Sequence, residues 1–386
     1  MATAPVAAER PDTPEEAAEL LRTLGEARRP VRIRGGGTKS GWAWDGEPVA
    51  LEVVTGGLSR VVEHNEGDFT AILEAGLPLA RARQVFAGAE QMLALDPPLG
   101  AADAATLGGV LATADSGPLR HRYGTMRDLC VGITVALSDG SLAKAGGKVI
   151  KNVAGYDLGK LFTGSFGTLG LVVSVAVRLH PLPDATATAL GSGTDPAVLA
   201  GAVATLARLP LEADCLDVAW DAGGGRVLVR FGGAAAERQA GAVLDRLRAA
   251  GLDDVQSTAD DEALWRAQRD GQRSLDGAVV KVAARPTDLA TVLGAAREAD
   301  ATVVGRAALG LSWLALEGDD LPGRIEALRA ALAPCPCTVL DAPEEVRPSI
   351  DPWPDADPGA VAVMRRVKER FDPARIFRPG SFVGGI

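Results

Sequence analysis

The stretch Thr106-Leu-Gly-Gly-Val-Leu-Ala-Thr113, which runs on to Ser116-Gly-Pro118, is the part of this sequence that indicates the fold. Two similar glycine-rich stretches flank it, Arg34-Gly-Gly-Gly-Thr38 and Gly164-Ser-Phe-Gly-Thr-Leu-Gly170, and each adjoins a strand-like apolar run. Glycine adopts positive φ and lets backbone N–H groups approach a ligand without a Cβ in the way. Successive N–H groups of this kind form anion-binding concavities. Three such stretches therefore predict a long ligand that contains a diphosphate.

Two common nucleotide motifs do not fit the glycine pattern. Lys39-Ser40 resembles the end of a phosphate loop, but Thr38 stands where that motif requires glycine. No G-x-G-x-x-G occurs, which disfavours a Rossmann dinucleotide site. An isolated Gly-Gly-Gly is typical of a tight surface turn, and Gly108 and Gly109 alone are compatible with core packing. The hypothesis depends on the three stretches occurring together.

The composition is that of a soluble globular protein with room for two domains. The chain has 386 residues, of which 47% are hydrophobic and 23% charged, and its net charge is -10. The negative charge argues against nucleic acid or an anionic membrane as the main partner. Cys335-Pro-Cys337 offers too few ligands for a zinc or iron–sulfur site, so we expect reduced cysteines and no metal.

The first residues lack the features of a signal peptide, and no window approaches the length of a membrane span. We therefore expect a cytoplasmic protein with no direct membrane insertion, in which membrane association comes through a partner.

Helix and strand signals divide the chain. Thr13 as N-cap, Pro14 and Glu16 predict a helix that ends at Gly25. Strand and helix patterns alternate up to Pro98, and Asp139-Gly140 predicts a hairpin turn. From about 185 to 345, strands alternate with alanine-rich helices, which predicts an α+β layer with a mostly antiparallel sheet covered on one face. A last helix follows Pro358, and the sequence contains no recognisable internal repeat.

The order of the glycine stretches resembles the FAD-binding domain of the vanillyl-alcohol oxidase and p-cresol methylhydroxylase (PCMH) superfamily. Two further segments resemble glycolate oxidase flavin subunits: Gly147-Lys-Val-Ile-Lys-Asn-Val-Ala-Gly-Tyr-Asp-Leu158 and Phe371-Asp-Pro-Ala-Arg-Ile-Phe-Arg-Pro-Gly380. The resemblance implies an α+β protein with a two-subdomain PCMH-type FAD-binding domain over residues 1–180. The rest of the protein would be an α+β cap domain over 185–345 and a C-terminal segment over 346–386. That segment would return to the FAD domain.

The resemblance implies FAD as the cofactor and identifies the residues that would hold it. Relatives with covalent flavin often carry a histidine in or near the first loop, and residues 34 to 41 contain none, so we expect non-covalent FAD. The expected cofactor-binding residues are Arg34, Gly35, Gly36, Gly37, Thr38, Pro97, Thr106, Gly108, Gly109, Thr113, Ser116, Gly117, Arg122, Tyr123, Gly124, Gly167, Gly170, Leu171 and Val172. Relatives often have glutamate at the position of Phe166 and asparagine at that of Arg378.

The expected catalytic motif is missing. Catalytic 2-hydroxy-acid dehydrogenases of this branch carry a late H-A-G-D-G-N-x-H stretch, whereas this chain has Arg306 and Trp313 where the histidines are expected. His64, His121 and His180 are the only histidines. The catalytic residues therefore stay unknown. A helix around Trp265 resembles the one that borders the substrate pocket in relatives, and an ordinary amphipathic helix with Trp265 in the core is the alternative. Arg269, Arg285 and Arg306, together with Lys281, are candidates to bind a carboxylate.

Among glycolate oxidase components, the resemblance is to the smaller of the two FAD-binding subunit types. It implies oxidation of glycolate to glyoxylate in a complex with a larger FAD-containing subunit and an iron–sulfur subunit. One alternative is a self-sufficient FAD-linked dehydrogenase or oxidase of a small 2-hydroxy acid such as D-lactate. Another is a cofactor-free scaffold that keeps only the fold. The sequence does not decide the substrate, the electron acceptor or the stoichiometry.

Overall fold

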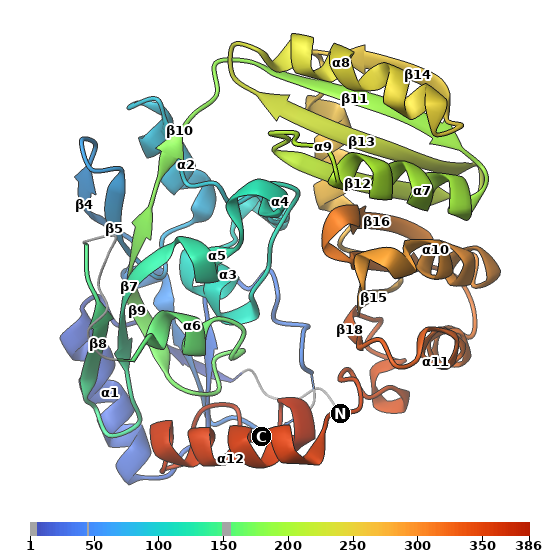
Figure 1. Cartoon of the computed structure of the whole chain (residues 1–386). Coiled ribbons are helices and arrows are strands. Elements are labelled where there is room, and N and C mark those ends of the chain that lie inside the picture. Colours follow the sequence, from blue (N-terminus) through green and yellow to red (C-terminus); the bar gives the residue numbers. More distant parts are fainter. Residues whose placement is uncertain (1–5, 45, 149–155) are drawn as a thin grey trace.

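The computed structural model describes residues 6–44, 46–148 and 156–386. Two lobes lie side by side, one built from the N-terminal elements and the C-terminal helix, the other from the elements between them (Figure 1). We call them the FAD lobe and the cap, following the expectation above.

The FAD lobe contains two main sheets. A parallel three-stranded sheet has the order β1-β3-β2, and an antiparallel five-stranded sheet has the order β4-β5-β9-β7-β8. A short β6-β10 pair lies outside both sheets. The strands are β1 (Ala7–Glu9), β2 (Val31–Arg34), β3 (Leu51–Val54), β4 (Val61–Asn65), β5 (Thr70–Glu74), β6 (Gln91–Met92), β7 (Cys130–Ala136), β8 (Leu142–Gly146), β9 (Leu171–Arg178) and β10 (His180–Pro181).

Short helices connect these strands. The predicted first helix is confirmed as α1, where the Thr13 hydroxyl accepts from the N–H of Glu16. The Glu16 carboxylate accepts from the N–H of Asp12, one residue before the N-cap. The predicted β7–β8 hairpin at Asp139-Gly140 is also confirmed. The helices are α1 (Pro14–Glu26), α2 (Leu79–Ala87), α3 (Leu107–Thr113), α4 (Arg120–Tyr123), α5 (Met126–Leu129), α6 (Leu158–Phe162) and α12 (Pro358–Phe371).

The cap is one antiparallel sheet of eight strands with the order β14-β11-β13-β12-β16-β17-β15-β18. Its strands are β11 (Thr186–Gly193), β12 (Cys215–Asp221), β13 (Gly224–Gly232), β14 (Asp253–Thr258), β15 (Ala278–Ala283), β16 (Thr302–Arg306), β17 (Leu311–Leu316) and β18 (Cys337–Asp341). Its helices are α7 (Pro196–Ala207), α8 (Ala236–Ala249), α9 (Glu262–Asp270), α10 (Leu289–Glu298) and α11 (Leu321–Leu332).

The cap contains a structural repeat that the sequence did not reveal. The element order β11-α7-β12-β13-α8-β14 recurs as β15-α10-β16-β17-α11-β18. Each half is a βαββαβ unit of the ferredoxin-like type. The two units meet where β12 pairs with β16, with Val218 opposite Gly305. We call this junction the seam. The repeat was missed because it lies in topology, whereas the two halves share only an alanine-rich composition.

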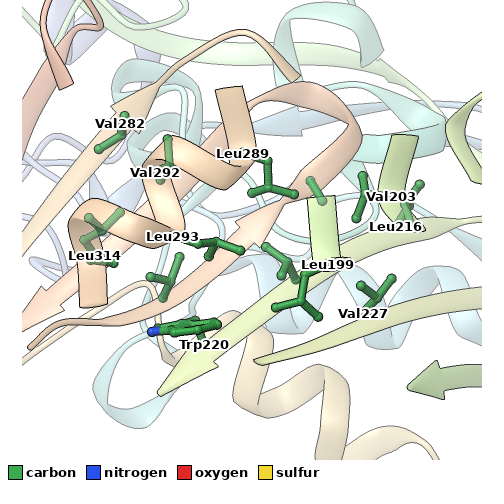
Figure 2. Packing of buried hydrophobic residues seen from close by; sticks show 14 of the residues in the cluster. Leu199, Val203, Leu216, Trp220, Val227, Val282, Leu289, Val292, Leu293 and Leu314 are labelled. Carbon is green, nitrogen blue, oxygen red and sulfur yellow. The ribbon is translucent and has the colours of Figure 1, made fainter. Parts of the chain in front are cut away.

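One continuous core lies between the cap sheet and the helices on its outer face. Leu199 and Val203 of α7 meet Leu289 and Leu293 of α10 above Trp220 (Figure 2). The opposite face of the sheet carries α9 and faces the FAD lobe, where Gln272, just after α9, bonds Ser116. The expectation of a mostly antiparallel sheet covered by helices on one face is therefore confirmed.

Candidate functional site

The three glycine-rich stretches meet at one cleft in the FAD lobe. The cleft encloses about 860 Å³ of empty space, its open mouth included. Thirteen of the nineteen expected cofactor residues line it: Arg34, Gly35, Gly36, Gly37, Thr38, Thr106, Gly108, Gly109, Thr113, Gly167, Gly170, Leu171 and Val172. The loop after β2, the start of α3 and the turn before β9 thus converge although they are far apart in sequence.

The loop after β2 offers donors to the cleft. Gly35, Gly36 and Gly37 follow the last residue of β2, and their N–H groups have no acceptor within the described residues. Gly37 has φ +75°, and a Cβ there would come no closer than 3.7 Å to another protein atom. The side of the loop at Gly37 is therefore open. A nest of unpaired N–H groups of this kind suits a diphosphate.

The start of α3 contributes less than expected. The N–H of Gly108 donates to the carbonyl of Ala75, and that of Gly109 to the hydroxyl of Thr106, which caps the helix. The hydroxyl of Thr113 donates to the carbonyl of Gly109. These donors are already used within the fold, so this stretch shapes the wall of the cleft. Gly108 and Gly109 line the cleft as expected, but their N–H groups are bonded within the fold.

The turn before β9 closes another side of the cleft. Gly167 has φ +73°, and a Cβ there would lie 3.9 Å from its nearest neighbour, Ile33. The turn is held from behind by α12, because the ammonium of Lys368 donates to the carbonyl of Thr168 at 2.7 Å. Leu171 and Val172 continue from the turn into β9 and are buried.

Positive charge dominates the polar groups of the cleft. Arg32 and Arg34 share the carboxylate of Glu52, at 2.5 and 2.7 Å. The ammonium of Lys39 lies 3.1 Å from Oδ2 of Asp115, and both side chains are almost fully buried. Arg378 also lines the cleft and donates to the carbonyl of Ala43 at 2.6 Å. Burial lowers the pKa of Arg378 to about 10, so it stays protonated near neutral pH.

An aromatic cluster stands beside the cleft at the position where relatives often have glutamate. Phe166 lines the cleft and has φ +53°. Its ring lies 5.0 Å from Trp353, 5.7 Å from Phe382 and 6.5 Å from Trp42. The cluster joins the first and third glycine regions to the C-terminal segment, and it leaves this wall of the cleft without a carboxylate at residue 166.

The remaining expected cofactor residues lie outside the cleft lining: Pro97, Ser116, Gly117, Arg122, Tyr123 and Gly124. The turn at Arg122 faces the cap, because Arg122 donates to the carbonyl of Glu212 and Tyr123 lies 3.3 Å from Asp214. Burial raises the pKa of Tyr123 to about 12. Part of the predicted Gly147–Leu158 segment, residues 149–155, lies outside the described residues.

The three candidate substrate arginines are in different surroundings. Arg285 is exposed and pairs with Asp288 at 3.0 Å. Arg269 pairs with Glu262 at 2.7 Å in a separate concavity between the lobes. Arg306 is fully buried at the seam and pairs with Asp217. The expectation that they gather at one carboxylate site is not supported by these positions, because Arg285 points to solvent and the two terminal nitrogens of Arg306 are held by Asp217, Gln268 and Gln272.

The three histidines and Lys281, which could serve as acids or bases, either bond other protein groups or lie outside the cleft lining. His64 bonds Gln91 at 3.0 Å, and His180 stacks edge-on against Tyr123 at 4.7 Å. Burial lowers the pKa of His121. Lys281 on β15 stands 5.6 Å above the ring of Trp313, and burial lowers its pKa. In the described part of the chain, no group of three or more His, Cys, Asp or Glu side chains could hold a metal ion.

Sequence reasoning did not assign Arg32, Lys39 or Arg378 to the cofactor site. Arg32, Lys39 and Arg378 line the cleft, and Asp115 neutralises one of them. In the sequence, Lys39 stands out only as part of an incomplete phosphate loop. No local pattern links Lys39 to Asp115, so only the fold reveals the pair.

Comparisons with known proteins agree with this geometry. Residues 5–146 match a family model described as an FAD binding domain, and residues 355–382 match the C-terminal domain of FAD linked oxidases. The N-terminal part of the chain is therefore an FAD-binding domain, and its C-terminal segment is of the FAD-linked oxidase type. The fold of the chain resembles that of alkyldihydroxyacetonephosphate synthase, with a TM-score of 0.71 and 17% identity over 96% of this chain and 76% of that one. The PCMH-type fold and the FAD cofactor predicted from the sequence are therefore confirmed.

Sequence relatives cover the chain to different extents. An uncharacterised FAD-linked oxidoreductase of Mycobacterium tuberculosis is 28% identical over 98% of this chain and 91% of its own length. Glycolate oxidase subunit GlcE of Escherichia coli is 32% identical, but over 43% of this chain and 48% of its own length.

The residues of the cleft fit an FAD. The unpaired N–H groups after β2 suit the diphosphate, and the open Cα positions of Gly37 and Gly167 leave room that side chains would fill. Lys39 and Arg378 add positive charge toward an anionic ligand. None of the helices in the described ranges is long and apolar enough to cross a membrane.

Proposed function

We propose that this chain is an FAD-binding subunit of a glycolate oxidase (glycolate dehydrogenase) complex and supports oxidation of glycolate to glyoxylate. The partners would be a larger FAD-containing subunit and an iron–sulfur subunit, in the cytoplasm or at a membrane reached through them. Similarity to GlcE supports this type of subunit. The observation that carries the proposal is the burial of Arg306 against Asp217 where catalytic relatives carry a histidine.

In this proposal the cleft holds FAD without a covalent bond. The N–H groups of Gly35 to Gly37 bind the diphosphate, with Thr38 and Lys39 beside them. The turn at Gly167 and the start of β9 form the wall against the ring system and ribityl chain. When bound, FAD supplies the acceptor for a hydride from C2 of a hydroxy acid.

The chain itself offers little for the proton transfer that accompanies such a hydride transfer. A general base must lie within hydrogen-bond reach of the substrate hydroxyl. None of the three histidines is among the residues that line the cleft. The arginines proposed for substrate, Arg269 and Arg306, are engaged by Glu262 and Asp217. We therefore assign the protein the role of binding, orienting and shielding a flavin, with substrate chemistry on the larger subunit.

The test is an absorption spectrum of the purified chain, followed by anaerobic addition of glycolate. We expect a flavin spectrum that stays oxidised until the larger flavin subunit is added. A flavin that bleaches with glycolate or D-lactate and this chain alone would contradict the subunit role. That outcome would favour the second candidate, a self-sufficient dehydrogenase or oxidase of a small 2-hydroxy acid. A colourless protein that takes up no FAD would contradict both.

A further inference from the structure

A buried polar chain crosses from the seam of the cap to the cleft. Arg306 on β16 pairs with Asp217 on β12 and donates to the side-chain oxygen of Gln272. The amide nitrogen of Gln272 donates to the carbonyl of Ser116 at 2.9 Å. Asp115 accepts from the N–H of Ser116 at 3.0 Å.

This series of hydrogen bonds, which starts at Arg306, ends in the wall of the cleft. The other carboxylate oxygen of Asp115 lies 3.1 Å from the ammonium of Lys39, which lines the cleft. Arg306, Asp217 and Gln272 are at most 1% exposed, Ser116 is 1% exposed and Asp115 is 4% exposed. Water is therefore excluded from most of this hydrogen-bonded series, and each of its hydrogen bonds acts in a medium of low dielectric constant.

We propose that Arg306 is a positioning residue that, through Gln272 and Ser116, fixes the Asp115–Lys39 pair at the cofactor cleft. Arg306 has a planar guanidinium whose two ends serve different partners. One end is held by Asp217, and the other holds the side-chain oxygen of Gln272 and the carbonyl of Gln268, the latter at 3.2 Å. The orientation of Gln272 is thereby fixed, and its N–H₂ group must face Ser116.

The physical consequence concerns the segment after α3. Ser116 lies in the loop between α3 and α4, and among the described residues Gln272 of the cap is the one donor to its carbonyl. If that contact is lost, Asp115 and Lys39 keep their charges but lose their fixed place. The cap then determines how well the cleft is preorganised for its ligand, although no cap residue lines the cleft.

Several charged groups surround the hydrogen-bonded series from Arg306 to Lys39, and they affect how FAD affinity depends on pH. Asp217 on β12 and Asp96 on the loop after β6 face Arg306, as does Arg120 on α4. Asp96 also faces Arg83 on α2 and Arg269 on α9. The groups nearest Gln272 itself are Arg306 and the carbonyl of Ser116.

The experiment uses the full chain freed of flavin and titrated with FAD, with fluorescence as the readout, at pH 8 and pH 6. Gln272→Glu keeps the acceptor for Arg306 but replaces the donor to Ser116 by a carboxylate. We expect its Kd for FAD to rise about tenfold at pH 8, which corresponds to one hydrogen bond to a buried group. At pH 6 part of the loss returns, because a protonated carboxyl group can donate to Ser116 again.

Two further variants complete the design. Gln256→Glu makes the same chemical change on the exposed edge strand β14 and keeps the wild-type Kd. Arg306→Lys keeps a charge for Asp217 but has no second arm for Gln272, so it also weakens FAD binding. The melting temperature of each flavin-free variant shows whether the whole fold has changed.

The inference rests on the proposal that FAD occupies this cleft, and the outcomes separate the two. A wild-type chain that binds no FAD contradicts the cofactor site and the coupling together. A Gln272→Glu chain that binds FAD within about twofold of wild type at both pH values contradicts the coupling alone. A Gln272→Glu chain whose loss of FAD affinity is the same at both pH values and is matched by a lower melting temperature also contradicts the coupling. Gln272 would then support only the fold.

Discussion

Lys368 donates its ammonium to the carbonyl oxygen of Thr168 at 2.7 Å, which joins the C-terminal helix to the turn before β9. The same ammonium pairs with Asp372 at 2.7 Å and donates to the carbonyl of Phe377 at 2.8 Å. Asp372 is fully buried and also accepts from the N–H groups of Ile376 and Phe377. A wall of the cleft and the C-terminal segment thus share one buried cation.

Lys368→Met should lower the free energy of unfolding by about 3 kcal/mol, because it leaves the buried carboxylate of Asp372 without its cation. Urea denaturation followed by tryptophan fluorescence measures this. The double variant with Asp372→Asn should lose less stability than the single variant, since no buried charge is then left unpaired. A double variant as unstable as the sum of the two single variants would show that the two side chains do not interact.

Gly167→Ala should weaken FAD binding at least tenfold, since a methyl group at φ +73° is strained and occupies the open side of the turn. The loss of stability should be only about 1 kcal/mol. Gly201→Ala on α7 is the matched control, because a Cβ there has no neighbour within 4 Å. The control should keep the wild-type Kd and gain up to about 1 kcal/mol of stability. Equal FAD affinity of both variants would rule out the Gly167 turn as part of the cofactor site.

The contribution of Asp217 to the free energy of unfolding should fall between pH 4 and pH 7. Burial, opposed by Arg306, raises the pKa of Asp217 from 3.8 to about 7. The folded state then binds a proton that the unfolded chain has released, so the free energy of unfolding decreases as pH rises through this window. Above about pH 7 this contribution is constant.

Urea unfolding of wild type and Asp217→Asn at pH 5, 6, 7 and 8 tests the linkage. The variant lacks the carboxyl group, so its stability should have a less negative slope between pH 5 and pH 7. Parallel stability curves for the two proteins would mean that Asp217 is ionised throughout, as the partner of Arg306.

Phe166→Glu should destabilise the protein by about 2 kcal/mol or more, because it places a carboxylate among Trp42, Trp353 and Phe382. Thermal unfolding of the flavin-free chain measures the loss. Phe166→Gln places an uncharged amide of the same size at the same φ, so the difference between the two variants isolates the cost of the charge. A Glu variant as stable as wild type would show that this wall accepts the residue that relatives often carry.

Local signals in the sequence predicted several of the helices and turns. Thr13 and Gly25 mark the ends of α1 closely because capping depends on neighbouring residues. Asp139-Gly140 likewise indicated the turn that joins β7 to β8. The convergence of Gly37, Gly109 and Gly167 was inferred from a family resemblance, and the cleft contains all three.

Long-range relationships could not be predicted in this way. Lys39 and Asp115, or Arg306 and Asp217, are partners only because the topology makes their elements neighbours. The arginines were grouped by their chemistry, yet Arg285 is exposed beside Asp288 whereas Arg306 is enclosed at the seam. Whether a backbone N–H group is free for a ligand also depends on tertiary contacts. The N–H of Gly108, for example, donates to the carbonyl of Ala75 on a different segment.

The repeated βαββαβ units give the cap the architecture of a two-fold dimer whose subunits are covalently joined. In a true homodimer, each substitution appears on both sides of the axis, and residues at the axis meet their own copies. Here β12 contributes Asp217 and β16 contributes Arg306, so opposite charges face each other across the junction. Fusion of the two units thus allows the Asp217–Arg306 pair to occur once, whereas a two-fold axis would have required a second copy of it.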